Sequence, residues 1–262
     1  MSELIARFRE LHERGCFVIP NPWDAGSARL LVQLGFPALA TTSSGFAWSV
    51  GRRDNHVSLE QALAHFREIC SAIDVPVSGD FEGGFAIEPA GVAANVAAAS
   101  ATGLAGLSIE DSTGDPAHPL FDFGLALDRV RAAREATDLI LTARCEAYLV
   151  GNPDLAETIR RLTAYAAAGA DCLYAPGMRD LGEIKAVVDA VAPKALNVLA
   201  GSDFSTVAEL HSIGVRRISV GGALARAAWT GFLEAAEELA ERGTFTRLAR
   251  AVPFASINGR FE

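Results

Sequence analysis

Residues 75–110 read VPVSGDFEGGFAIEPAGVAANVAAASATGLAGLSIE, and this stretch decides the fold class. An apolar run centred on Val77 ends in acidic residues, and a second run centred on Ser108 ends in the same way. Residues 89–109 carry no charge and are rich in Ala, Gly, Ser and Thr, which predicts a small-residue helix, a turn and a strand. Their hydropathy is too weak for a membrane span, which needs about 20 strongly apolar residues. The stretch is therefore a strand–helix–strand unit.

The same unit recurs along the whole chain. Each apolar run is followed by a turn signal and then by a helical pattern. Ser58 with Gln61 forms a capping box, and Asn152 with Pro153 is expected to open a helix that ends at Gly169. The eight runs are centred on Val18, Ala40, Val77, Ser108, Thr142, Tyr174, Val198 and Ser219.

Regular alternation of strands and helices implies parallel strands joined by right-handed crossovers and covered by helices. Eight units in 262 residues is about 33 residues per unit, close to what a (β/α)₈ barrel needs. An open doubly wound sheet is the alternative, but it would normally show G-x-G-x-x-G after an early strand, and no early strand end has this pattern. We therefore expect an α/β protein in which residues 1–262 form a single TIM barrel domain with a C-terminal helical segment.

Composition excludes several classes of partner. The chain has 32 acidic and 23 basic residues and a net charge of −9, which would repel nucleic acid and anionic lipid alike. The four cysteines lie far apart, and the start of the chain has no continuous apolar core of a signal peptide. We expect a cytoplasmic protein that binds neither nucleic acid nor membranes.

The helix predicted at residues 222–242 is apolar over a wide arc. One stripe, which includes Leu224 and Phe232, is expected to cover a face of the barrel. A second stripe, which includes Trp229 and Leu233, predicts contact with another chain, because large exposed apolar patches are unusual on monomers. Burial of the second stripe under the C-terminal segment is equally compatible with the pattern.

Polar residues gather at the predicted strand ends, where barrel enzymes build their active sites. Each residue by itself could be a helix cap or a solvated turn residue. Together they predict a functional site. In strand order they are Asn21, Trp23 and Asp24; Thr42, Ser43, Ser44 and Gly45; Asp80 and Glu82; Glu110 and Asp111; Arg144 and Glu146; and Asn197.

Asp80 and Glu110 end consecutive strands, and neighbouring parallel strands lie about 4.8 Å apart, so their carboxylates should converge. Like charges at this distance are unfavourable unless a cation joins them. Oxygen ligands without Cys or His favour Mg²⁺, which Mn²⁺ could replace. The alternative is a rim without metal in which Arg144 neutralises both acids. Further candidates for the metal shell are Asp54, Glu82 and Asp111.

Arg144 supplies a planar fork suited to a substrate carboxylate or phosphate. The run Ser43-Ser44-Gly45-Phe46 adds hydroxyl and amide groups that could hold the other end of an anion. Such a set would hold a small dicarboxylate or 2-oxo acid and stabilise its enolate. Trp23 could form a wall of the pocket. Candidates for proton transfer are Asp115, His118 and Glu146, whereas Cys145 should face the helices.

Six segments in this order resemble the isocitrate lyase and phosphoenolpyruvate mutase superfamily. They are NPWDAGSARLL (21–31), TTSSGFAWSVGRRD (41–54), VPVSGDFEGGF (75–85), GLSIEDS (106–112), LTARCEAY (141–148) and GVRRISVGG (214–222). The resemblance implies a (β/α)₈ barrel, usually a tetramer in which the eighth helix is exchanged between neighbours. A homo-oligomer, dimer or tetramer, is therefore expected.

The resemblance also implies site roles. Asp80 corresponds to the direct Mg²⁺ ligand, Glu82 stands where the family often has a second Asp, and Glu110 and Asp54 correspond to the water-mediated shell.

For the substrate, the resemblance implies that Ser44, Gly45 and Phe46 hold the carboxylate and carbonyl oxygens. Arg144 corresponds to the arginine that binds the substrate carboxylate, and Asn197 to an asparagine that lines the pocket.

The loop after the fourth strand departs from the family. Isocitrate and methylisocitrate lyases carry Lys-Lys-Cys-Gly-His there, and this chain reads EDSTGDPAHPLFDF (110–123). What remains is the enolate-stabilising half of the machinery. It predicts a Mg²⁺-dependent lyase or decarboxylase that cleaves or forms a C–C bond, or alternatively a P–C bond, next to the carbonyl of a small 2-oxo or 2-hydroxy carboxylate. Two alternatives stay open: a barrel that binds phosphate at Gly201, Gly221 and Gly222, and a non-catalytic 2-oxo-acid-binding relative.

Overall fold

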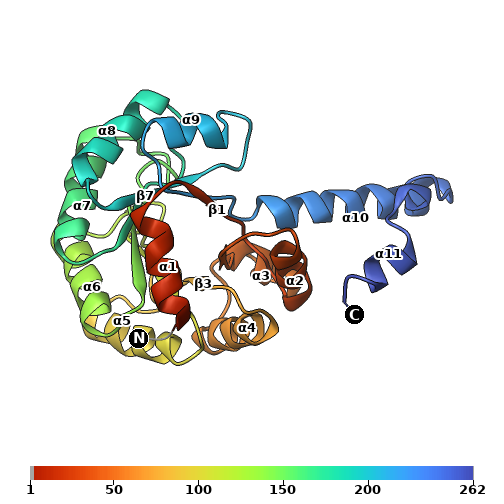
Figure 1. Cartoon of the computed structure of the whole chain (residues 1–262), viewed down its shortest axis with the longest axis horizontal. Coiled ribbons are helices and arrows are strands. Elements are labelled where there is room, and N and C mark those ends of the chain that lie inside the picture. The colour runs from red at the N-terminus through yellow and green to blue at the C-terminus, as the bar shows by residue number, and fades with distance from the viewer. Residues whose placement is uncertain (1–2, 262) are drawn as a thin grey trace.

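The computed structural model describes residues 3–261 and places a ring of strands inside a layer of helices (Figure 1). Every run predicted as a strand contains one at its predicted centre. The strands are β1 (Phe17–Ile19), β2 (Leu39–Ala40), β3 (Val77–Asp80), β4 (Gly106–Glu110), β5 (Ile140–Arg144), β6 (Cys172–Tyr174), β7 (Ala195–Leu199) and β8 (Arg217–Ser219).

The strands are hydrogen-bonded in the order β1-β8-β7-β6-β5-β4-β3-β2, and every pair is parallel. Because each strand lies next to its neighbour in the sequence, this order confirms the (β/α)₈ barrel and excludes the doubly wound sheet. β1 and β2 meet at the seam, where the Ala40 amide donates to the Pro20 carbonyl at 3.1 Å. The barrel is therefore nearly closed.

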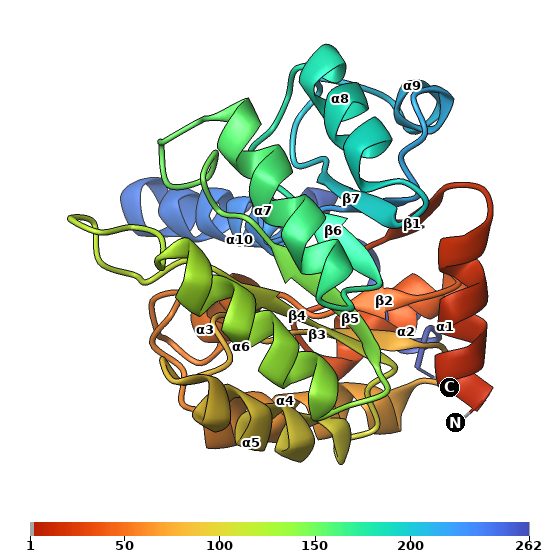
Figure 2. The same cartoon turned by 90° about the vertical axis from the view of Figure 1, so that its left-hand side faces the viewer.

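The helices follow the strands around the outside (Figure 2). Ser58 and Gln61 form the expected capping box at α4. The prediction at α7 was wrong by two residues, because Asp154 caps this helix and accepts the Glu157 amide at 2.9 Å. The helices are α1 (Glu3–Glu13), α2 (Ala25–Gln33), α3 (Ser43–Ser49), α4 (Leu59–Ala72), α5 (Pro89–Ser100), α6 (Phe123–Glu135), α7 (Leu155–Ala167), α8 (Leu181–Val191), α9 (Val207–Ser212), α10 (Ala223–Arg242), the 3₁₀ turn η1 (Leu248–Arg250) and α11 (Phe254–Asn258). No helix within residues 3–261 is long and apolar enough to cross a membrane.

α1 covers the amino-terminal ends of the strands. Its Phe8 is fully buried in a cluster with Phe17 and Ile140. A Cβ on Gly106 would approach the Phe8 ring to 2.7 Å, so the glycine allows the helix to sit against β4. With this end covered, ligands can reach the barrel interior from the carboxyl ends of the strands.

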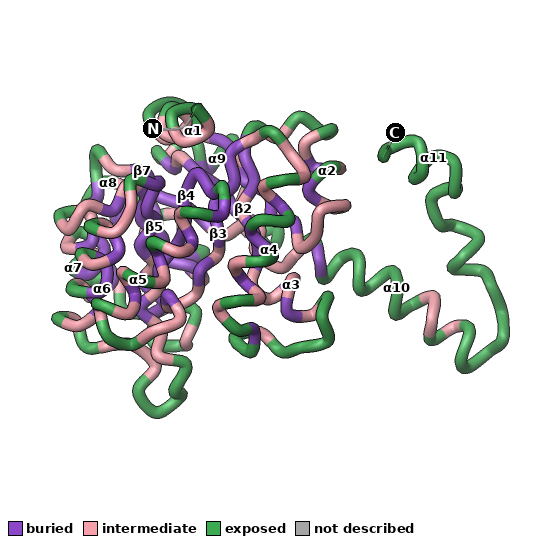
Figure 3. The backbone as a smooth tube through the Cα atoms, turned by 90° about the horizontal axis from the view of Figure 1, so that it is seen from below, coloured by how far each residue is buried: buried purple, intermediate pink, exposed green. Residues whose placement is uncertain are grey.

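α10 corrects one expectation. We predicted that one of its apolar stripes would cover a face of the barrel, but the helix leaves the barrel and extends away from it (Figure 1). Only Ala225 is buried along its length (Figure 3). The C-terminal segment does not bury the second stripe either: Trp229 and Leu233 are 37% and 50% exposed. Within residues 3–261, no residue of either stripe of α10 is buried.

The half-buried His12 of α1 predicts a pH dependence of stability. Burial, and then the charge of Arg217, lower the pKa of His12 from 6.5 to about 3. Below pH 6.5 the unfolded chain takes up a proton at this residue and the folded chain does not. The free energy of unfolding should therefore fall as the pH falls from 6.5 towards 3, by at most about 1.4 kcal/mol per pH unit from this group.

Urea unfolding between pH 4 and 7 measures this dependence. His12→Gln should flatten it, whereas substitution of the exposed His211 by Gln should leave it unchanged. An equal slope in wild type and His12→Gln would contradict the assignment.

Candidate active site

A cavity of about 200 Å³ opens at the carboxyl ends of the strands. It collects polar side chains from all around the barrel, as the sequence predicted for this end of the fold. The polar residues that line it are Asn21, Thr41, Thr42, Ser43, Ser44, Asp54, Ser78, Asp80, Ser108, Arg144, Tyr174, Asn197, Arg217 and Ser219.

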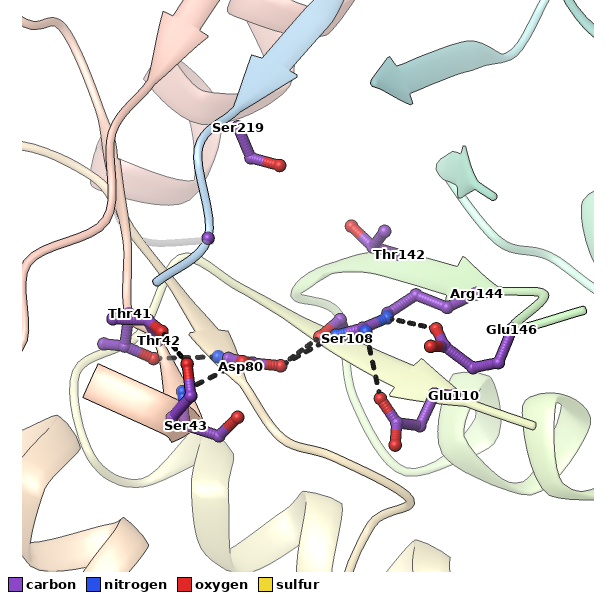
Figure 4. Close-up of polar contacts among 12 residues, drawn as sticks. Thr41, Thr42, Ser43, Asp80, Ser108, Glu110, Thr142, Arg144, Glu146 and Ser219 are labelled. Atoms are coloured by element: carbon purple, nitrogen blue, oxygen red, sulfur yellow. Dashed lines mark hydrogen bonds and ion pairs between the residues drawn. The ribbon is translucent and has the colours of Figure 1, made fainter. Parts of the chain in front are cut away.

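Arg144, the last residue of β5, is held by three carboxylates (Figure 4). Its Nη1 lies 3.0 Å from Asp80 Oδ1, its Nη2 3.1 Å from Glu110 Oε2, and its Nε 2.7 Å from Glu146 Oε1. The Tyr174 ring covers it, with Cζ 5.1 Å from the ring centroid. Two charge-assisted hydrogen bonds, to Asp80 and Glu146, and the ion pair with Glu110 fix the plane of the guanidinium. N–H donors of the guanidinium remain for a ligand.

Asp80, the last residue of β3, is oriented by neighbouring strands. Its amide donates to the Thr41 hydroxyl at 2.8 Å, and its Oδ2 accepts the Ser43 amide at 3.0 Å. Ser108 on β4 lies 3.5 Å from Oδ1. These contacts turn the carboxylate into the barrel, so its position follows from the parallel pairing of β3 and β4.

The cluster carries more negative than positive charge. Burial, and then the charges of Asp80 and Asp54, raise the pKa of Glu82 to about 8. Burial raises the pKa of Glu110 well above its usual value even though Arg144 opposes the change. Burial and the charge of Asp80 also raise the pKa of Asp54. Asp54, Glu82 and Glu110 would therefore be stabilised either by binding a proton or by an added cation.

The donor set fits a hard divalent cation such as Mg²⁺. The salt bridges expected for a rim without metal do form around Arg144. They leave two acids uncompensated, because neither Glu82 nor Asp54 has an ion-pair partner within residues 3–261. In the same described part, no three acidic, imidazole or thiol side chains are placed to ligate one ion directly. Mg²⁺ keeps several waters and uses one or two carboxylates, so it suits this arrangement.

Asp111 lies behind the cluster and does not line the cavity, so it does not fit the metal shell for which it was a candidate. It is 3% exposed and faces α7. Its Oδ1 accepts the Glu146 amide at 2.8 Å, and its Oδ2 accepts Arg161 Nη1 at 3.0 Å and the Tyr165 hydroxyl at 2.8 Å. Asp111 therefore fixes the backbone that carries Glu146. Cys145 faces the same helix, as expected, with Sγ 3.9 Å from Thr158 Oγ1.

Two residues expected to offer amides to a substrate do not line the cavity. The Gly45 amide donates to Thr42 Oγ1 at 3.3 Å, and the Phe46 amide donates to the Thr42 carbonyl at 3.1 Å, so both amides are used within α3. The Phe46 ring stacks on His65, with centroids 3.9 Å apart. A Cβ on Gly45 would lie 3.0 Å from the Trp23 side chain. Gly45 therefore serves close packing.

Four other candidates also lie away from the cavity lining. Trp23 packs against α3 instead of forming a wall. His118 is 85% exposed and pairs with Asp115 at 3.5 Å in the loop that projects between β4 and α6 (Figure 2). Glu146 is buried behind Arg144 and touches it, so its place is that of a positioning residue for the guanidinium.

Sequence reasoning missed Arg217 as a cavity residue. Arg216 and Arg217 are consecutive in the sequence. Successive side chains of a strand point to opposite faces, and β8 separates the pair: Arg217 is inside the barrel, whereas Arg216 bonds the Glu13 carbonyl at 2.9 Å. The alternation of β8 could have placed Arg217 inward.

This chain is similar in sequence and fold to several known proteins. The family model for phosphoenolpyruvate phosphomutase matches residues 8–240. A Burkholderia cenocepacia structure described as a lyase/mutase is 47% identical, with a TM-score of 0.95 over 98% of this chain and 96% of that one. An oxaloacetate decarboxylase from Paraburkholderia xenovorans is 32% identical over 71% of this chain and 65% of its own length. A structure of oxaloacetate acetylhydrolase with oxalate is 26% identical, with a TM-score of 0.85 over 98% of this chain and 93% of that one.

The buried Asp111 predicts a large effect on stability. Asp111→Ala should lower the free energy of unfolding by about 3 kcal/mol, because it leaves the buried Arg161 with one carboxylate fewer and the Glu146 amide without an acceptor. Denaturant unfolding measures the change. The control is Asp128→Ala, which removes an exposed ion pair with Arg131 and should cost less than about 1 kcal/mol. Equal costs for the two variants would contradict the role given to Asp111.

Proposed function

The chain belongs to the phosphoenolpyruvate phosphomutase family, and on that premise we propose that it is a Mg²⁺-dependent carbon–carbon lyase or decarboxylase that acts on a small 2-oxo or 2-hydroxy carboxylate through an enolate. The observation that carries the proposal is the excess of carboxylates around Arg144 at the open end of the barrel. The lyase and decarboxylase relatives support the reaction class.

Asp80 would hold the metal directly, because it lines the cavity and is fixed by β2 and β4. Glu82, Glu110 and Asp54 would hold it through water. A bound Mg²⁺, or Mn²⁺ in its place, would supply positive charge next to the enolate oxygen.

Arg144 binds the substrate carboxylate through its remaining N–H donors. Glu110 and Glu146 keep its plane fixed, so little reorganisation accompanies binding. Ser43 and Ser44 border the same cavity, and the Ser44 hydroxyl is held 3.1 Å from Thr42 Oγ1. These residues orient the carboxylate end of the substrate.

Asp54 is the proposed proton-transfer group. It lines the cavity, whereas Glu146 lies behind Arg144, and Asp115 and His118 belong to the exposed loop. A proton taken up or released next to the reacting carbon would pass through its carboxyl group.

The phosphate-binding alternative receives less support. Gly201, Gly221 and Gly222 line an adjoining cavity of about 430 Å³. The Gly221 amide, however, donates to Asn21 Oδ1 at 2.8 Å and is not available to a phosphate. A non-catalytic relative would also keep the ligand contacts, and a turnover assay with 2-oxo acids separates it from an enzyme.

Oxalate, which resembles an enolate, tests the proposed site. Calorimetry should give binding that requires Mg²⁺ and that is lost in Asp80→Ala, because the metal would lose its direct ligand. Asp115→Ala should bind as the wild type does, since this carboxylate lies in the exposed loop. Tight binding of oxalate to metal-free protein would overturn the proposal.

We also propose a homo-oligomer, a dimer or tetramer, in which α10 packs on a neighbouring barrel. The exposed apolar stripes of α10 support it, together with the exchanged helix implied by the resemblance. Mass measurement in solution should give a multiple of the chain mass, and Phe232→Glu with Leu233→Glu should shift the protein to the monomer. Glu237→Lys on the same helix is the control. A wild-type monomer at micromolar concentration would contradict the exchange.

A further inference from the structure

A second arginine of the cavity, Arg217, has only neutral partners. It is 5% exposed and lies on β8 inside the barrel. Its Nε donates to Asn197 Oδ1 at 2.9 Å and its Nη2 to Thr142 Oγ1 at 3.0 Å. Its Nη1 lies 3.2 Å from His12 Nε2.

His12 cannot offset this charge, because an imidazole is either neutral or positive. Burial, and then Arg217 itself, lower the pKa of His12 to about 3. Asp171, an acid near this end of the barrel, is occupied by Arg9 at 3.1 Å and Arg134 at 2.9 Å. Within the described residues, no carboxylate forms an ion pair with Arg217. A buried guanidinium without a counter-charge is costly.

Arg144 presents the opposite case. Its three carboxylate partners more than neutralise it, so it attracts an anion weakly unless a metal offsets the acids. Arg217 attracts an anion without such help. The two arginines border the same cavity.

The backbone register shows how the two arginines are arranged. Arg144 pairs with Tyr174, Tyr174 with Asn197, and Asn197 with Arg217, on four adjacent strands. The cavity surface near Arg217 carries hydroxyl and amide groups: Ser219 accepts a hydrogen bond from Asn197 Nδ2 at 2.9 Å. A polar interior with a free charge is unusual in a barrel, whose interior is normally filled by bulky apolar side chains.

We propose that Arg217 binds a second anionic group of the substrate. In this arrangement, which rests on the proposed function, the 2-oxo or 2-hydroxy acid end lies at Arg144 and the metal site, and the far end carries a carboxylate that reaches Arg217. Arg217 then determines specificity: it favours acids with two anionic groups over acids of the same length with one. Two of its five N–H donors remain for this contact.

Malate and 2-hydroxybutyrate test the proposal, because both have four carbons and only malate has a terminal carboxylate. Calorimetry with Mg²⁺ should show that the wild type binds malate at least about tenfold more tightly, the size expected for a charge-assisted hydrogen bond in a buried site. Arg217→Gln should reduce this preference to about threefold or less. Arg217→Lys keeps the charge and should keep part of the preference.

Arg216→Gln is the matched control, since it removes the same charge from the other face of β8 and should keep the full preference. Oxalate is too short to need Arg217, so its affinity should be the same in Arg217→Gln and wild type. Thermal unfolding verifies that each variant is folded.

Four results would count against the proposals. A wild type without preference for malate, or an unchanged preference in folded Arg217→Gln, would overturn the inference. Equal losses of malate and 2-hydroxybutyrate affinity would mean that Arg217 only supports the structure of the barrel interior. This result would also overturn the inference. Failure of oxalate to bind the wild type with Mg²⁺ would overturn the proposed function itself, and the two failures are therefore distinguishable.

Discussion

Three carboxylates around the Arg144 guanidinium are the arrangement on which the site depends. Parallel pairing of β3, β4 and β5 brings Asp80 and Glu110 to the two sides of Arg144. Burial strengthens each ion pair and also makes the surplus negative charge costly. Burial, and then the same surplus of negative charge, raise the pKa of Glu82 to about 8. The geometry of the site and its excess of negative charge therefore have one cause.

The charge is distributed unequally across the cavity. Acids concentrate at the ends of β3 to β5, and an uncompensated guanidinium, Arg217, lies on β8. A ligand with an anion at each end would need the metal at one end only. Behind this surface, Asp111 ties the strand ends to α7, so the orientation of Arg144 is supported by a buried network beyond its direct partners.

Much of the fold could be predicted because it depends on local patterns. Alternating runs placed all eight strands, and the capping box at Ser58 formed as expected. The predictions that failed concern where one helix begins, what covers another and which groups the amides of a third contact. The apolar stripe of α10 was assigned to the barrel, yet the helix extends away from it. Gly45 and Phe46 were assigned to the substrate, yet their amides satisfy the first turn of α3.

The sequence by itself determined the barrel, its open end and the residue types gathered there. Hydrophobic periodicity and strand order depend only on local sequence patterns. Only the tertiary structure decided which charges compensate one another. Asp80 and Arg144 are 64 residues apart and Arg217 and Thr142 are 75 apart, so their pairing depends on strand register and barrel closure. Arg144 has three acidic partners and Arg217 has none, a difference that the residue type alone does not reveal. Their different buried neighbours give the two arginines different chemistry.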